Sequence, residues 1–267
     1  MDSNFTIDGL KISFTDRGNT NGLPVIFMHG FPFDKTMWAP QIAAVGDNIR
    51  PITYDIRGHG QSDLGNGYFS IEFFVDDLIA LLDYLELDQA VLCGLSMGGY
   101  IALRATERHP ERITALVLCD TKSTADSDEA RVGRAKSIQF MFTHGVDKFA
   151  DTFAGAVFAP ATIKQQPALV EQIKSTIRAT DANAIAATLM ALAARTDTTA
   201  SLSQLNCPLL IIVGEQDALT PPSDSEAMLA AAPGATLALI PDAAHLSNLE
   251  NPEDFNQALL GFLDSLS

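Results

Sequence analysis

One serine in the chain lies in a setting that suits nucleophilic chemistry. Ser96 is the central residue of Gly94-Leu95-Ser96-Met97-Gly98, which follows the apolar run 90–93 and precedes a helical pattern. A serine on a sharp strand-to-helix turn exposes its oxygen, and the flanking glycines avoid Cβ clashes in that turn. The start of the next helix directs free N–H groups at the reacting centre. Ser96 is therefore a candidate nucleophile, whose attack on a carbonyl group would form an oxyanion.

A serine hydroxyl needs a base, and the base needs an acid that orients it. Two further polar residues lie just after apolar runs: Asp217 after the run 208–213, and His245 after the run 236–240. If these strands are parallel, both side chains meet Ser96 at one edge of the sheet. Asp120 is the alternative acid, because it also follows an apolar run. The Gly214-Glu215-Gln216-Asp217 context favours Asp217.

Strand and helix patterns alternate along most of the chain. Residues 4–16 predict two strands around a turn at Asp8-Gly9, and 25–28 and 48–55 predict buried strands. Ser70 can cap a helix whose apolar positions recur at helical spacing. Strands that are separated by helices indicate a mainly parallel sheet with helices on both sides.

Five motifs in order carry a resemblance to a known family: 25–32, 54–62, 94–99, 214–217 and 244–245. The chain resembles the α/β-hydrolases, and within them small bacterial-type serine esterases, 3-oxoadipate enol-lactonases and cofactor-free perhydrolase-like enzymes. The resemblance implies a mainly parallel eight-stranded sheet flanked by helices, with a helical cap inserted after the sixth strand. It also implies that no metal or organic cofactor is required. Ala244 replaces a usual glycine, which we expect only to stiffen the loop.

The alternation of strands and helices breaks at residues 122–202, which are rich in alanine and have no strand signal. We assign 122–202 to the helical cap, and 1–121 and 203–267 to the α/β-hydrolase core. The segment holds five phenylalanines, which we expect mostly in the core of the cap: Phe140, Phe142, Phe149, Phe153 and Phe158.

The resemblance further implies an oxyanion hole made of two backbone N–H groups, those of Phe31 and Met97. Both donors are backbone groups, so neither side chain has to be polar. His29 precedes the Gly30-Phe31 step, and we interpret it as a residue that braces the loop rather than as a base. His59 lies in Arg57-Gly58-His59-Gly60, and we interpret it as structural because these neighbours indicate a fixed turn behind the site.

Composition excludes several classes of function. The formal net charge of -16 argues against binding to nucleic acid or to an anionic membrane surface. No apolar run is long enough to cross a bilayer, and the start of the chain lacks a secretory signal pattern. The three cysteines, Cys93, Cys119 and Cys207, lack metal-ligand spacing, and we expect all three to be buried in a protein of the cytoplasm.

These observations favour a serine hydrolase of carboxylic esters that works through an acyl-enzyme and prefers small acyl groups. Its partner would be a small-molecule ester or lactone.

The competing interpretation is an enol-lactonase, in which a cap arginine pairs with a substrate carboxylate. The candidates for that role are Arg131, Arg134, Arg178 and Arg195. A receptor or scaffold without turnover is the alternative of another class. The sequence leaves the oligomeric state open.

Overall fold

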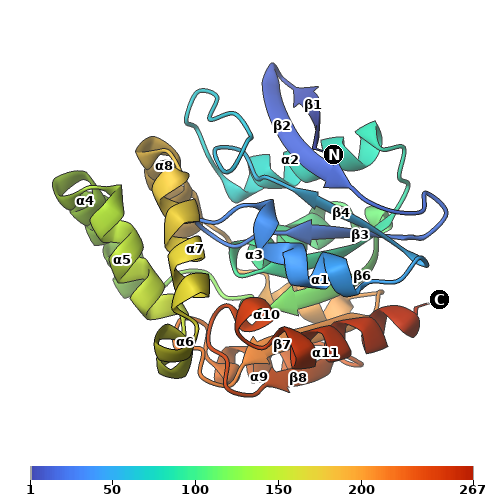
Figure 1. The fold of residues 1–267 in the computed structure, drawn as a ribbon. Helices are drawn as coiled ribbons and strands as arrows, with labels where there is room; N and C mark the ends of the chain where they lie inside the picture. Colours follow the sequence, from blue (N-terminus) through green and yellow to red (C-terminus); the bar gives the residue numbers. More distant parts are fainter. Residues whose placement is uncertain (1, 267) are drawn as a thin grey trace.

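A computed structural model describes residues 2–266 as an eight-stranded sheet with flanking helices (Figure 1). The strands are β1 (Ser3–Ile7), β2 (Leu10–Asp16), β3 (Leu23–Met28), β4 (Ile49–Tyr54), β5 (Ala90–Leu95), β6 (Ile113–Cys119), β7 (Leu209–Gly214) and β8 (Thr236–Ile240). The helices that accompany the sheet are α1 (Ala39–Ala44), α2 (Ile71–Tyr84), α3 (Met97–Arg108), α9 (Pro222–Ala231), α10 (Ser247–Glu250) and α11 (Pro252–Asp264). Short 3-10 helices are η1 (Lys35–Trp38), η2 (Pro110–Arg112) and η3 (Thr199–Gln204).

The sheet has the order β1-β2-β4-β3-β5-β6-β7-β8. Only the β1–β2 and β2–β4 pairs are antiparallel, and every other neighbouring pair is parallel. The prediction of a mainly parallel eight-stranded sheet is confirmed. The first hairpin turns at Asp8 and Gly9, whose φ angles of 50° and 80° are those that a tight hairpin turn needs.

Parallel pairing brings the carboxyl ends of β3, β5, β6, β7 and β8 to one edge of the sheet. The central strand β5 is buried along its whole length, which explains why its sequence is continuously apolar. Helix α2 begins at Ser70, whose hydroxyl accepts a hydrogen bond from the Phe73 N–H as the sequence predicts. Its buried face packs against α3 and β1.

Five helices connect β6 to β7: α4 (Asp128–His144), α5 (Val146–Val157), α6 (Pro160–Gln165), α7 (Pro167–Ala179) and α8 (Ala182–Ala193). We call them the helical insertion. Figure 1 shows them together on one side of the molecule. Phe149 and Phe158 are buried, as expected, whereas Phe142 is exposed. The division into a core of 1–121 and 203–267 and a cap of 122–202 stays a prediction.

The expectation for the cysteines is only partly met. Cys93 and Cys119 are buried in neighbouring strands, but Cys207 is partly exposed. It precedes β7, so that the chain has not yet entered the interior of the sheet.

Glycines set the distance between β3, β5 and the turn that follows β5. A Cβ built at Gly98 would lie 2.3 Å from the carbonyl oxygen of Met28 in β3. A Cβ at Gly94 would lie 2.3 Å from the backbone of Gly98. Backbone cannot move aside as a flexible side chain can, so both positions require glycine.

The variant Gly98→Ala should therefore lower the free energy of unfolding by about 1–3 kcal/mol, the usual cost of overpacking. Gly261→Ala is the matched control, because Gly261 is exposed in α11 with nothing within 4 Å of the added Cβ. It should raise that free energy by about 0.5–1 kcal/mol through helix propensity alone. Urea denaturation of both variants measures the difference. Equal stability of the two variants would contradict the close approach of α3 to β3.

Candidate active site

Ser96 lies between β5 and α3 in a conformation that few non-glycine residues adopt. Its φ is 53° and its ψ is -109°, which costs on the order of 1–3 kcal/mol. The surrounding backbone holds it there. The Ser96 N–H donates to the carbonyl oxygen of Cys119 at 2.8 Å, and the Thr121 hydroxyl donates to the Ser96 carbonyl oxygen at 2.8 Å. The Ser96 hydroxyl of this turn lies beside the ring of His245.

The structure brings Ser96, His245 and Asp217 together in one hydrogen-bonded chain. The Nε2 atom of His245 lies 2.9 Å from the Ser96 Oγ, and its Nδ1 lies 2.8 Å from the Asp217 Oδ2. The carboxylate can only accept, so Nδ1 carries the ring proton and Nε2 is free to accept the serine proton. This is the geometry of a nucleophile with its base and an orienting acid.

Asp217 is held in the charged form that this arrangement needs. Burial would raise the pKa of its carboxyl group, but the charge and hydrogen bond of His245 and the hydrogen bonds of Thr220 hold the pKa below 3.8. The Thr220 hydroxyl donates to Oδ2 at 2.7 Å, and the Leu219 N–H donates to Oδ1 at 2.8 Å. The loop after β7 therefore fixes both oxygens of the acid.

Asp120, the alternative acid, lies beside this chain but outside it. Its Oδ1 accepts from the Gly214 N–H at 2.8 Å, and its Oδ2 bonds to the Ser247 hydroxyl. Complete burial and then the charge of Asp217 raise the pKa of Asp120 well above its ordinary value. The Asp120 carboxyl group thus ties β6 to β7 and α10, and within residues 2–266 it makes no hydrogen bond to His245.

Two backbone N–H groups, those of Phe31 and Met97, are candidates for binding an anion at Ser96. Within residues 2–266, neither the Phe31 N–H nor the Met97 N–H donates to another backbone group. Met97 is the first residue of α3, where N–H groups have no partner inside the helix. The Gly30 carbonyl accepts from the His29 ring and from the Phe33 N–H. Since a trans peptide directs its two polar groups oppositely, the Phe31 N–H points away from both donors.

His29 and His59 brace the loops behind the site. The Ile56 N–H donates to the His29 Nε2 at 3.0 Å, and the His29 Nδ1 donates to Gly30 at 2.9 Å. Burial lowers the pKa of His29 to about 4, and burial together with the neighbouring His29 lowers that of His59 to about 3. Both rings therefore stay uncharged in mildly acidic solution, and their role as braces agrees with the expectation from the sequence.

A cavity of about 270 Å³ opens above Ser96 and His245. Phe31, Tyr100 and Thr220 from the core line it, and so do apolar side chains of the helical insertion and the β7 loop: Phe153, Leu189, Leu192 and Leu219. The side facing α4 is polar. The cavity thus joins the serine to an apolar wall and a charged wall.

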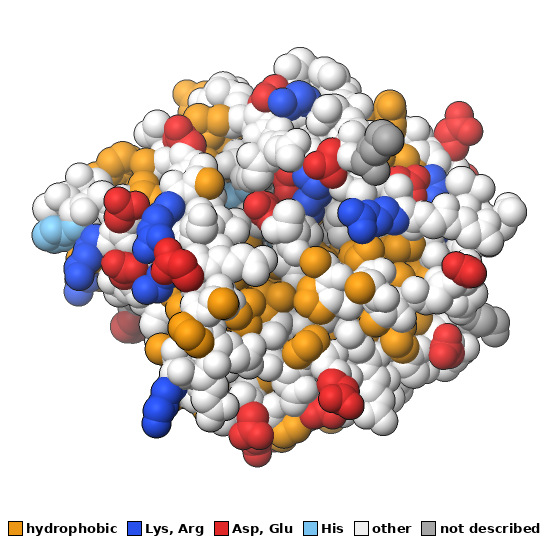
Figure 2. All heavy atoms as spheres, in the orientation of Figure 1, with side chains coloured by type: hydrophobic (Ala, Val, Ile, Leu, Met, Phe, Trp, Pro, Cys, Tyr) orange, Lys and Arg blue, Asp and Glu red, His pale blue; other side chains and the backbone are white. Residues whose placement is uncertain are grey.

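The structure places one of the four predicted arginines in this cavity. Arg134 lines it and pairs with Asp126, which Arg195 also contacts. Arg131 and Arg178 lie outside the cavity. Arg131 pairs with Asp128, and Arg178 pairs with acidic residues of α5 and α7. Figure 2 shows such interleaved acidic and basic side chains on the side where Figure 1 places α5 and α7.

Lys122 is a cavity residue that the sequence argument missed. It follows β6 by three residues and lines the cavity together with Ser96. Its only ion-pair partner among the described residues is Asp224, whose Oδ2 lies 3.9 Å from the ammonium nitrogen. The sequence could have indicated Lys122, because it lies just beyond the end of a strand, at the edge of the sheet where Ser96, Asp217 and His245 meet.

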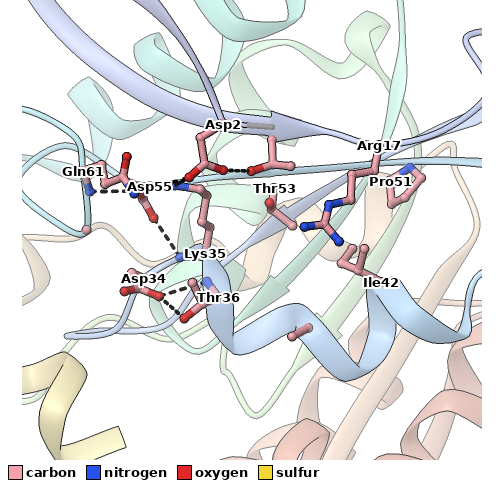
Figure 3. Close-up of a pocket in the computed structure, with 13 residues that line it drawn as sticks. Asp2, Arg17, Asp34, Lys35, Thr36, Ile42, Pro51, Thr53, Asp55 and Gln61 are labelled. Atoms are coloured by element: carbon pink, nitrogen blue, oxygen red, sulfur yellow. Dashed lines mark hydrogen bonds and ion pairs between the residues drawn. The ribbon is translucent and has the colours of Figure 1, made fainter. Parts of the chain in front are cut away.

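A second cavity of about 270 Å³ lies between η1 and the strands β2 and β4 (Figure 3). Lys35 reaches into its wall, with the ammonium 2.6 Å from Asp55 and 3.0 Å from the Ser13 hydroxyl. These groups satisfy one another, and no serine, histidine and acid are combined there. We therefore assign no chemistry to this cavity.

The comparisons with known proteins agree with this geometry. Residues 24–252 match the model of the alpha/beta hydrolase fold family. The chain belongs to the α/β-hydrolase fold family. It is 31% identical over 254 residues to 3-oxoadipate enol-lactonase 2 of Acinetobacter baylyi, covering 95% of this chain and 93% of that protein. Its membership of this family and its similarity to such relatives show that the chain is a hydrolase.

Two solved structures are similar over their whole length. A thermophilic esterase from Thermogutta terrifontis, with malate bound, is 35% identical at a TM-score of 0.93, covering 100% of this chain and 99% of that one. The enol-lactonase from Burkholderia xenovorans LB400 is 29% identical at a TM-score of 0.91, covering 98% of this chain and all of that one. The α/β-hydrolase therefore has both esterases and enol-lactonases among its relatives.

The two candidate acids can be separated by one pair of variants. Asp217→Asn should lower kcat for an ester by about 10⁴-fold, because the amide no longer fixes the required tautomer of His245. Asp120→Asn should leave kcat within about threefold, since an amide can still accept from Gly214 and donate to Ser247. Steady-state kinetics of both purified variants give the answer. If Asp120→Asn is the more damaging change, Asp217 is not the orienting acid.

Proposed function

We propose that the α/β-hydrolase is a serine hydrolase of carboxylic esters that works through an acyl-enzyme. The observation that carries the proposal is the hydrogen-bonded chain from Ser96 through His245 to Asp217 at the floor of a cavity. A receptor or scaffold, the alternative of another class, has no need for a serine, a base and an acid within hydrogen-bonding distance of one another.

In the first step His245 takes the hydroxyl proton as Ser96 attacks the carbonyl carbon. The N–H groups of Phe31 and Met97 hold the negative oxygen, and each such donor is worth about 3 kcal/mol in related sites. His245 then protonates the leaving alcohol, and the acyl-enzyme remains. In the second step His245 takes a proton from water as the water oxygen attacks the acyl carbon. The bond from that carbon to the Ser96 Oγ then breaks, His245 returns the proton to Oγ, and the acid leaves. Asp217 stabilises the charged imidazole throughout.

The dimensions of the cavity support small acyl groups. About 270 Å³ is just below the usual range for ligand pockets, and it must hold both the acyl group and part of the alcohol. Phe153 and Leu189, from the helical insertion, close the apolar side. We therefore assign the role of a cap to the helical insertion.

The second candidate is an enol-lactonase for a lactone that bears a carboxylate. Arg134 and Arg195 share the carboxylate of Asp126, and the Lys122 ammonium lies 3.9 Å from Asp224. Arg134 and Lys122 line the cavity itself, and either could pair with an acidic group on the substrate.

We propose that the protein lies in the cytoplasm and that it binds neither nucleic acid nor a membrane. The net charge of -16 and the unpaired cysteines support this part of the proposal. No helix within residues 2–266 has the length and hydropathy to cross a membrane. Within the same residues, no group of His, Cys, Asp and Glu could hold a metal ion.

The function is tested with p-nitrophenyl acetate, butyrate and decanoate and with the succinate half-ester. We expect many turnovers per molecule, acetate and butyrate at least about tenfold ahead of decanoate in kcat/KM, and ahead of the half-ester. One turnover or none would favour the receptor.

A higher kcat/KM for the half-ester would favour the enol-lactonase. In that case Arg134→Met should remove the preference, whereas Arg131→Met, one turn earlier on α4 and outside the cavity, should retain it.

A further inference from the structure

Glu250 is a buried carboxylate that joins two parts of the fold. It is the last residue of α10 and is only 7% exposed. Its Oε1 accepts from the Ala244 N–H at 2.8 Å, and its Oε2 accepts from the Ala159 N–H at 2.8 Å and from the Thr162 hydroxyl at 2.7 Å. Within residues 2–266, no basic side chain pairs with Glu250, so neutral donors alone hold this charge.

The donors lie on both sides of a junction. Ala244 immediately precedes His245, whereas Ala159 and Thr162 lie at the start of α6 in the helical insertion. The His245 N–H donates across the same junction, to the Val157 carbonyl at 3.0 Å. The backbone before and at the histidine is thus hydrogen-bonded to the insertion, directly at His245 and through Glu250 at Ala244.

We propose that Glu250 is a positioning residue for His245, and that the helical insertion thereby sets the place of the catalytic base as well as covering the cavity. The proposal rests on the proposed function, since it concerns the histidine of that site. Its physical basis is that the Nε2 of His245 must stay near 2.9 Å from Ser96, and an error of about 1 Å can cost about 10²-fold in rate. Burying a carboxylate carries a desolvation cost, which three hydrogen bonds to this junction offset here.

The first test is Glu250→Gln. The amide keeps the size of the side chain but has one accepting oxygen, so its NH₂ meets either the Ala244 N–H or the pair Ala159 and Thr162. We expect kcat for p-nitrophenyl acetate to fall at least tenfold with KM changed less than about threefold, because the base moves and the cavity does not. The acid limb of the pH profile of kcat/KM should move as well.

The control for a merely structural role is Asp77→Asn. Asp77 is also a buried carboxylate, which pairs with Arg57 and does not line the cavity. The Asp77→Asn variant should have a lower melting temperature, while its kcat and its pH profile of kcat/KM stay those of the unchanged protein. If Glu250→Gln behaves in the same way, with a lower melting temperature and normal kinetics, the proposal is overturned.

Thr162→Val is a milder variant that serves if Glu250→Gln does not fold. It removes one of the three donors and should lower kcat by a smaller factor than Glu250→Gln, and Thr162→Ser should restore kcat. Thr176→Val, on an exposed hydroxyl of α7, is the matched control and should have no effect. Normal kcat in Thr162→Val, together with normal kcat in a folded Glu250→Gln, would contradict the proposal.

A readout that does not require turnover separates this proposal from the proposed function. The proton on the His245 Nδ1, bonded to Asp217, gives a low-field NMR resonance whether or not an ester is hydrolysed. That resonance should shift or broaden in Glu250→Gln or Thr162→Val and stay unchanged in Asp77→Asn. If the unchanged protein hydrolyses no ester, the function fails, and the NMR result alone decides the role of Glu250.

Discussion

The turn at Ser96 is the constraint on which the other parts of the site depend. A non-glycine residue is held at φ 53° and ψ -109° because its N–H and its carbonyl are both bonded to the end of β6 and the residues beyond it. Gly94 and Gly98 let β5, α3 and β3 approach within backbone contact. The same turn sets the direction of the hydroxyl and places the Met97 N–H next to it in the chain, so one local geometry positions both the proposed nucleophile and an N–H group proposed to bind the oxyanion.

Asp217 and His245 lie at the same edge of the sheet as that turn. Not all of the hydrogen bonds that hold these two residues come from the sheet. Asp120 ties the end of β6 to Gly214 at the end of β7, and Thr220 and Leu219 fix the oxygens of Asp217. His245 differs, because its own N–H and the neighbouring Ala244 are held from the helical insertion, directly by Val157 and through Glu250. The insertion is therefore part of the scaffold of the site as well as a wall of its cavity.

The sequence allowed two features to be predicted for a physical reason: the fold, and the meeting of Ser96, Asp217 and His245 at one edge of the sheet. Strand ends, glycines and the order of Ser96, Asp217 and His245 are local features, and parallel pairing brings strand ends together whatever the details of packing. Asp120 remained a competitor because its partners, Gly214 and Ser247, are remote in the sequence. Arg134 could not be separated from Arg131 or Arg178 because helix composition does not reveal which side faces the cavity. Glu250 could not be predicted, since two of its three donors, Ala159 and Thr162, are about ninety residues away.

The most direct test of the central claim, that Ser96 is the nucleophile activated by His245, is covalent labelling with a fluorophosphonate. Intact-mass measurement of the unchanged protein should show one adduct, and peptide mapping should place it on Ser96. Ser96→Ala should take up no label, and the His245→Ala variant should react at least about 10²-fold more slowly, the usual contribution of a general base. An adduct on a different serine, or no adduct on folded protein, would contradict the account.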